Sequence, residues 1–175
     1  EMDQAWDQVA RAYGFVCNGC RDNCCTSLFF HHTQVENAYL AHGFSQHSPG
    51  VRKAVLERAR QYVDLTFNTD ALPEGREPES LKLLCPANQE GRCLLYAFRP
   101  MICRLHGLPH ELHRPGAPVL KGPGCTAGAF ESRDYIPFDR TPFYRKMAAV
   151  EMAFRRKTKL SGRVRLTVAQ ILLQT

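Results

Sequence analysis

Apolar residues recur at helical spacing near the N-terminal end of the chain. Trp6, Val9 and Tyr13 occupy positions i, i+3 and i+7, which predicts an amphipathic helix over residues 2–13. Gly14 follows this pattern, and glycine tolerates the left-handed conformation in which helices often end. The predicted helix therefore leads directly into a cysteine-rich segment.

Four further helices are predicted from end signals and periodicity. Ser48 followed by Pro49 is typical of an N-cap and a first helical residue, and predicts a helix to about residue 66. Thr141 followed by Pro142 predicts a helix to about residue 158 in the same way, and Thr167 is a suitable cap for a short final helix. The expected apolar faces are Val35, Ala38 and Tyr39 in a helix over 33–42; Val51, Val55, Ala59, Tyr62 and Val63; and Phe143, Met147, Val150 and Phe154.

Two segments read as irregular connections. Residues 68–80 are rich in proline and acidic residues, and residues 114–124 carry three prolines and three glycines, so both are predicted to be loops. The charged residues of the helix that begins after Ser48, including Arg58, are expected to face solvent. The predicted fold is mainly α: a single domain over residues 1–175, with helices around an irregular, loop-built cysteine-rich metal centre in 17–125 and a helical C-terminal part in 139–174.

Composition narrows the functional classes. The 175 residues contain no apolar run of the roughly 20 residues that a membrane span requires. The first twelve residues are polar and amphipathic rather than a signal peptide, which favours a cytoplasmic protein. The formal charge of +6 counts each cysteine as neutral, and ligation through all eight would bring it to −2 before any metal charge. Because no nucleic-acid recognition motif accompanies the basic residues, we do not expect nucleic acid as a partner.

The eight cysteines carry the strongest chemical signal. Four lie in the nine residues C-N-G-C-R-D-N-C-C, where the Cys-x-x-Cys step brings two thiolates to one metal. The adjacent Cys24 and Cys25 have diverging side chains in most conformations, so one of them is expected to serve a second metal or a larger cluster. Eight thiols make two four-ligand sites, or one cluster with an accessory site. The expected metal ligands are Cys17, Cys20, Cys24, Cys25, Cys85, Cys93, Cys103 and Cys125.

Disulfides and metal-free redox thiols are the alternatives to metal binding. Disulfide-dense domains are usually secreted and below about 80 residues, whereas this chain is longer and shows no signal peptide. Metal binding is therefore the preferred interpretation. Thiolates suit both zinc and iron–sulfur clusters, and the adjacent cysteines together with the apolar residues after Cys93 favour iron–sulfur.

The order of these cysteines resembles the family described as putative zinc- or iron-chelating proteins of the YkgJ type. The resemblance covers roughly residues 17–125, and it implies metal binding. Some larger relatives look like protein lysine methylases that act on flagellin. This chain has three residues rather than two between Cys20 and Cys24. The matching positions are Cys17, Cys20, Cys24, Cys25, Cys85, Pro86, Cys93, Tyr96, Arg99, Pro100, Cys103 and Arg104.

Residues among the ligands are candidates for supporting roles. Arg99, Arg104 and His106 are expected to donate hydrogen bonds to anionic sulfur around the cofactor. Tyr96, Arg99 and His106 are candidate catalytic groups by position alone. His31 and His32 follow the first cysteines closely and are further candidate ligands. His106, His110 and His113 are not expected on one helical face, because Pro109 interrupts a helix there.

Three functions are consistent with these features. The first is an iron–sulfur or zinc protein in redox or cluster-dependent chemistry. The second is a structural-zinc interaction module that binds a protein partner. The third is a protein-modifying enzyme of the lysine-methylase kind.

Overall fold

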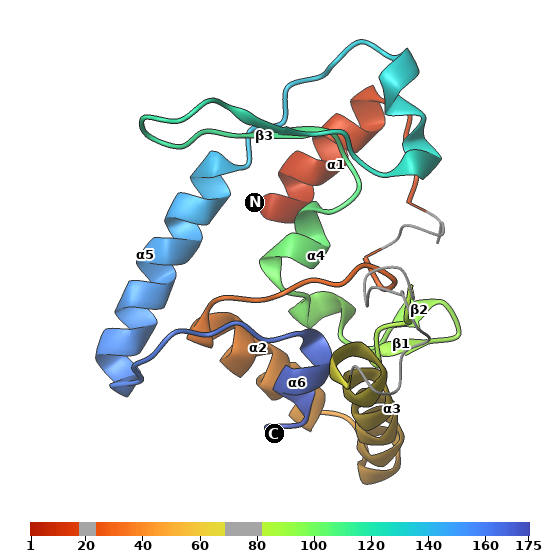
Figure 1. Cartoon of the computed structure of the whole chain (residues 1–175), viewed down its shortest axis with the longest axis vertical. Coiled ribbons are helices and arrows are strands. Elements are labelled where there is room, and N and C mark those ends of the chain that lie inside the picture. The colour runs from red at the N-terminus through yellow and green to blue at the C-terminus, as the bar shows by residue number, and fades with distance from the viewer. Residues whose placement is uncertain (18–23, 69–81) are drawn as a thin grey trace. The chain divides into compact units, whose positions relative to one another are not determined.

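A computed structural model describes residues 1–17, 24–68 and 82–175 of the chain (Figure 1). Its contacts divide the chain into two units. Unit 1 comprises Glu1–Cys24 and Met101–Lys159, and unit 2 comprises Cys25–Pro100 and Leu160–Thr175. Within the described residues the fold is mainly α, as predicted, with two small two-stranded sheets. Cys20 and residues 69–80 of the predicted connector lie outside the described residues, and the single-domain organisation stays a prediction.

Unit 1 begins with helix α1 (Met2–Ala12), which ends at the predicted place. Gly14 has φ +59°, the left-handed conformation for which glycine is suited. The amide of Phe15 bonds the Ala10 carbonyl at 2.8 Å, and the amide of Gly14 bonds the Arg11 carbonyl at 2.9 Å. This pair of bonds is the Schellman pattern, which satisfies the last carbonyls of the helix and turns the chain toward Cys17.

The core of unit 1 forms where α1 packs beside the short helix α4 (Met101–Leu105) (Figure 1). The Tyr13 and Phe130 rings meet edge to face at 4.8 Å, and Phe15 lies 5.2 Å from Phe130. Such aromatic pairs add to the stabilisation from apolar burial. The buried cluster consists of Ala10, Tyr13, Met101, Leu105, Leu108, Cys125, Phe130 and Phe138.

A hairpin follows α4 in unit 1 and corrects one prediction. Strand β3 (His110–Leu112) pairs antiparallel with β4 (Leu120–Gly122), with Glu111 opposite Lys121. The predicted loop over 114–124 is therefore wrong for residues 120–122. Its prolines and glycines form the turn, whereas the paired strands are too short to show an alternating pattern. Two 3₁₀ turns, Thr126–Gly128 and Phe130–Ser132, complete this region.

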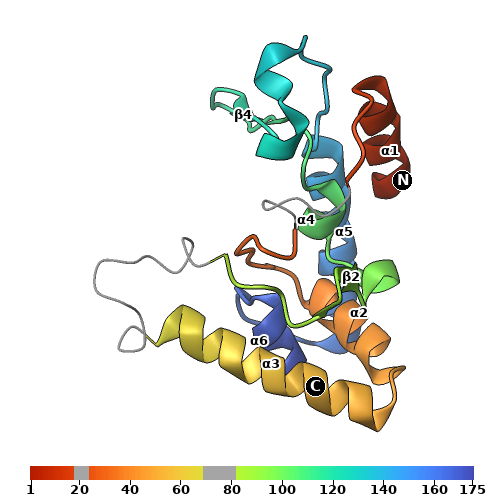
Figure 2. The same cartoon turned by 90° about the vertical axis from the view of Figure 1, so that its right-hand side faces the viewer.

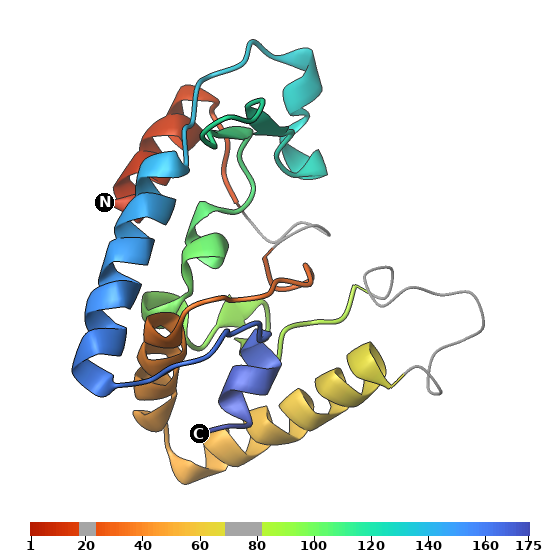
Figure 3. The same ribbon diagram turned by 60° about the vertical axis from the view of Figure 1, so that its left-hand side comes forward.

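The N-terminal end of helix α5 (Thr141–Thr158) lies beside strand β3 (Figure 3). Its cap differs from the prediction by one residue. The side chain of Asp139 accepts the Thr141 amide at 2.8 Å, while the Thr141 hydroxyl accepts the His113 amide at 2.8 Å. The predicted apolar face is also only partly correct, because Val150 is 52% exposed while Phe143 and Met147 pack against the core of unit 1.

Among the described residues of unit 2, helix α6 (Val168–Leu172) lies against both α2 (Gln34–Ser45) and α3 (Pro49–Phe67) (Figure 2). The caps of α3 and α6 are confirmed. Ser48 accepts the Val51 amide, and Thr167 forms a reciprocal capping box with Gln170. The buried cluster consists of Leu40, Phe44, Val55, Ala87, Leu95, Ile171 and Leu172.

The buried face of α2 differs from the predicted one. Ala38 and Tyr39 are exposed, whereas Leu40 and Phe44 are buried. The prediction ended this helix near residue 42 and so left out the turn that carries Phe44. In the described part of the chain, no helix has the length and apolar character to cross a membrane.

A tight hairpin in unit 2 joins β1 (Asn88–Gln89) to β2 (Arg92–Cys93). Glu90 and Gly91 form its two-residue turn with φ values of +52° and +81°, which is the type I′ geometry that suits the twist of paired strands. The register places Cys93 opposite Asn88. A 3₁₀ turn at Tyr96–Phe98 follows.

Candidate metal centre

Three cysteines from separate segments come together in unit 2. The backbone amide of Cys85 bonds the Cys25 carbonyl at 2.6 Å, which joins the end of the first cysteine segment to the start of the hairpin. The amide of Asn88 then bonds the Cys85 carbonyl at 2.9 Å, and Asn88 faces Cys93 across the strand pair. Backbone hydrogen bonding therefore brings Cys25, Cys85 and Cys93 into one neighbourhood.

These three cysteines are partly buried, and the effects of their thiols on one another show their mutual proximity. Burial raises the pKa of the Cys85 thiol to about 12, a backbone hydrogen bond from Ala87 lowers it, and the Cys25 and Cys93 thiols raise it further. Burial also raises the pKa of Cys93, against a hydrogen bond from the backbone of Leu95. Each of these two sulfurs thus accepts a hydrogen bond from the residue two positions later, an interaction that favours the thiolate form.

Helix α3 contributes two side chains to this neighbourhood that sequence reasoning missed. Arg58 donates from Nε and Nη2 to the Pro86 carbonyl, at 3.1 and 2.9 Å, and its charge lowers the pKa of Cys85. Burial and the nearby Cys85 thiol raise the pKa of Tyr62. The expectation that Arg58 simply faces solvent is therefore wrong. Its spacing of i, i+4 from Tyr62 was the available signal, because such residues share one helix face.

Arg99 follows the β1–β2 hairpin in the sequence. Its guanidinium stacks on the Tyr96 ring at 3.6 Å from the ring centre, and its Nε bonds the Tyr96 carbonyl at 3.1 Å. The charge of Arg99 lowers the pKa of the Cys93 thiol. The Tyr96 side chain is 62% exposed, so this stacked pair lies at the surface of unit 2.

Unit 1 holds Cys17, Cys24, Cys103 and Cys125 among its described residues. Cys125 is buried in the core, and its amide bonds the Gly107 carbonyl at 2.9 Å. A Cβ atom on Gly107 would lie 3.9 Å from the Cys125 sulfur and 3.8 Å from the Phe15 ring, which is ordinary van der Waals contact with both. Cys103 lies on α4, and Cys17 is exposed after the end of α1.

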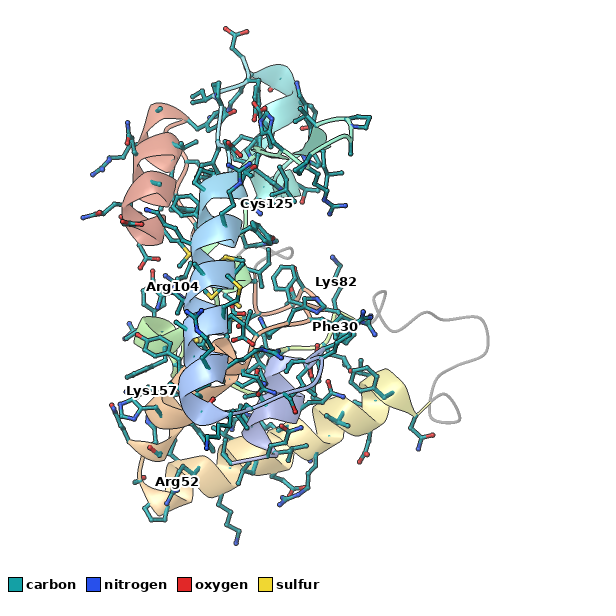
Figure 4. The ribbon with its side chains drawn as sticks, turned by 90° about the vertical axis from the view of Figure 1, so that its left-hand side faces the viewer. Phe30, Arg52, Lys82, Arg104, Cys125 and Lys157 are labelled. Atoms are coloured by element: carbon teal, nitrogen blue, oxygen red, sulfur yellow. The ribbon has the colours of Figure 1, made fainter. Side chains whose placement is uncertain are left out.

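The other predicted supporting residues of unit 1 have identified partners. Arg104 forms an ion pair with Asp3 at 2.5 Å, and Figure 4 labels both Arg104 and Cys125. The carbonyl of His106 accepts the Trp6 indole proton at 2.8 Å. Helix α4 ends at Leu105 and His110 belongs to strand β3, which confirms that Pro109 does not lie within a helix carrying all three histidines.

A metal centre requires several donor side chains that converge on one point. Residues 1–17, 24–68 and 82–175 contain no group of three or more His, Cys, Asp or Glu side chains that could hold a metal ion as they stand. No disulfide joins any two of the seven described cysteines. The three thiols of unit 2 nevertheless supply the soft donors that zinc and iron–sulfur centres use, with backbone amides directed at two of the sulfurs. The donor type of these residues therefore matches such a group, whereas their placement among the described residues does not form a set that holds a metal.

Comparison with known proteins gave no relatives: no family model matched the chain, and neither a curated protein nor a solved structure matched it.

Proposed function

We propose that this chain is a metal protein that holds an iron–sulfur cluster, or zinc as the alternative, through cysteine thiolates. The supporting observation is the convergence of Cys25, Cys85 and Cys93 in unit 2. The first cysteine segment and the β1–β2 hairpin meet there, and these partly buried thiols make no disulfide with another described cysteine. Membership of the YkgJ-type family is part of the same proposal and rests on the order of cysteines in the sequence.

The surroundings of the thiols favour iron–sulfur over zinc. Leu95 is 1% exposed and Ala87 is 2% exposed, and both follow the cysteines closely in sequence. A dry thiolate pocket with amide donors suits a cluster, whose potential depends on burial and on hydrogen bonds to sulfur. A bound cluster would supply one-electron chemistry. We therefore propose a redox or cluster-dependent role in the cytoplasm, with a protein or small-molecule partner.

The metal content of the untagged chain tests this proposal. The protein is purified under strict anaerobiosis, its visible spectrum is recorded, and iron, zinc and acid-labile sulfide are measured per chain. A brown protein with stoichiometric iron and sulfide supports a cluster. A colourless protein with zinc moves the proposal to a zinc interaction module, and a chain that binds neither metal refutes it.

A substitution pair makes the same test specific to the thiols. Cys85→Ser should lower the metal content, because Cys85 is central to the neighbourhood in unit 2. Ser27→Ala is the matched control, since it alters a residue close to Cys25 without removing a thiol. Equal metal content in Cys85→Ser and in the unaltered chain would mean that the metal is held elsewhere.

A further inference from the structure

Helix α5 of unit 1 carries an exposed face on the side opposite to its buried residues. Phe143 and Met147 pack against the core of unit 1, whereas Val150 is 52% exposed and Met152 is 59% exposed. Because residues four positions apart share one face of a helix, the exposed positions form two parallel rows. The rows of this outward face are Tyr144, Ala148, Met152 and Arg156, and beside them Arg145, Ala149, Ala153 and Lys157, the last of which Figure 4 labels.

The charged residues of α5 are almost all basic. Five of its 18 residues are lysine or arginine, and its one acidic residue, Glu151, is buried. Glu151 pairs with Arg155, and Lys146 pairs with Glu1 at 2.6 Å. Arg155 and Lys146 both lie outside the two rows, so their ion pairs flank the outward face and do not neutralise it.

Two cations at the C-terminal end of the outward face lack an acidic partner. In the parts of the chain that the structure describes, Arg156 and Lys157 form no ion pair and no hydrogen bond. The helix dipole favours cations at this end. It does not account for Val150 and Met152, which add exposed apolar surface directly before the two cations.

We propose that the outward face of α5 docks an acidic amphipathic helix of a partner protein. Apolar residues of the partner would cover Met152 and the alanines, and its carboxylates would meet Arg156 and Lys157. Opposite charges across an interface speed association and exclude partners of the wrong charge. Rows of residues four apart are also the ridges that pack in the commonest helix–helix contacts. This inference does not depend on metal binding.

Other occupants match the outward face less well. Helices that lie in a membrane surface bury bulky residues such as Trp, Phe and Leu, whereas Phe143 of α5 packs against the core and alanines occupy the centre of the exposed rows. A second copy of this chain would set like charges against one another. Nucleic acid would match the cations through its phosphates but leave Met152 uncovered.

A labelled helical peptide tests the docking to the full chain. The probe carries fluorescein and is about five helical turns long, with leucines along one face and glutamates beside them. A second peptide has the same composition in an order that removes this face. Anisotropy titration should show binding to the first peptide about 10-fold tighter than to the second, and weaker as salt rises. Equal affinities, or no binding of either peptide, would overturn the proposal.

Variants locate the binding on α5. Arg156→Glu combined with Lys157→Glu should weaken peptide binding by about 10-fold, and Met152→Ser should weaken it several-fold. Lys53→Glu combined with Arg60→Glu is the matched control, since it changes the net charge equally at exposed positions of α3 and should leave the affinity unaltered. Equal losses in the two double variants, or no loss in Met152→Ser, would mean that charge alone acts and would contradict the docking. Circular dichroism confirms that each variant is folded.

Two further probes distinguish the other occupants. Vesicles of phosphatidylserine and phosphatidylcholine, and a DNA duplex, are titrated under the same conditions. Binding to either probe that is tighter than to the peptide and is lost in the α5 double variant would assign the outward face to lipid or nucleic acid and overturn the proposal. A dimer in sedimentation analysis that the same variant abolishes would assign it to a second copy, with the same consequence.

Discussion

At the scale of single residues, His31 combines deep burial with an unsatisfied nitrogen. Its side chain is 2% exposed, and its Nε2 has no hydrogen-bond partner among the residues described. Backbone bonds of 2.7 and 3.0 Å tie His31 to Leu166 in the returning C-terminal segment of unit 2. Burial, and to a smaller extent His32, lowers the pKa of His31 to about 4. A buried neutral imidazole of this kind makes stability depend on pH.

The pH window follows from the two states of His31. The unfolded chain titrates near 6.5 and the folded chain near 4, so the unfolded state binds more protons between these values. The contribution of neutral His31 to the free energy of unfolding is complete above pH 6.5. The free energy of unfolding then decreases by about 3 kcal/mol as the pH falls toward 4. Urea unfolding between pH 4 and 8 measures it. His31→Leu should flatten the curve and the exposed-site control His42→Gln should not, whereas equal slopes in His31→Leu and the unaltered chain would contradict the assignment.

The thiols of Cys85 and Cys93 lead to a second prediction at the residue scale, which concerns the release of protons when metal binds. Burial raises the pKa of both thiols, so both are protonated at pH 7 in the metal-free chain. Metal binding should then release about one proton from each. Calorimetric titration with zinc in buffers of different ionisation enthalpy measures this release, and Cys85→Ser should reduce it by about one. Heats that do not vary with the buffer would show that these thiols are already ionised.

At the scale of elements, Gly43 fixes the distance between α2 and the 3₁₀ turn after β2. A Cβ atom at this position would lie 2.2 Å from Cγ and 2.7 Å from Cβ of Phe98, so the base of the ring and not only its tip obstructs it. Gly43→Ala should therefore destabilise the protein by about 1–3 kcal/mol, the usual cost of overpacking. Denaturant unfolding monitored by circular dichroism checks this value.

Gly50 provides the matched control on α3. No atom lies within 4 Å of a Cβ built there, so Gly50→Ala should be neutral or stabilise the helix by up to about 1 kcal/mol. Combining Gly43→Ala with Phe98→Ala should recover part of the loss, because the obstructing ring is then absent. Similar stabilities for the two alanine variants would show that α2 is not packed closely against Phe98.

The helices could be predicted because their end signals are local. Ser48, Thr167 and Gly14 act through their own neighbouring amides or their own φ angle, so each signal is complete in the sequence. The strands could not be predicted in this way, since β1 and β2 have two residues each and no period can be seen. The exposure of Val150 depends on tertiary packing, which helical spacing does not specify.

The candidate site was predictable in its residue types but not in its grouping. The cysteine spacing indicated thiols as the chemistry, and the adjacent pair led to the prediction that Cys24 or Cys25 serves a second metal or a larger cluster. What spacing could not show is that Cys25 bonds to Cys85 through the backbone, 60 residues along the chain. The sequence likewise did not reveal the role of Arg58, which was interpreted as a solvent-facing charge. Its acceptor is the Pro86 carbonyl, and because every residue type supplies a backbone carbonyl, no sequence pattern marks such a partner.

At the scale of the whole molecule, each unit is discontinuous in sequence. The chain passes between units after Cys24, Pro100 and Lys159, and α6 returns to complete the core of unit 2. Leu172 is 0% exposed and belongs to the same cluster as Val55 of α3. Because neither unit is a continuous segment, we expect the two to unfold together, as the predicted single domain requires.

Trp6 allows this cooperativity to be measured, since it is the only tryptophan in the sequence and lies in unit 1. Leu172→Ala, a cavity in unit 2, should cost about 2–5 kcal/mol. In a cooperative molecule, it should lower the unfolding midpoint seen by Trp6 fluorescence as much as the midpoint seen by circular dichroism. Leu160 is 46% exposed, so Leu160→Ala should change both unfolding midpoints only slightly. A Trp6 midpoint that stays fixed in Leu172→Ala would show two independently folding parts, because damage to the core of unit 2 would then not reach unit 1.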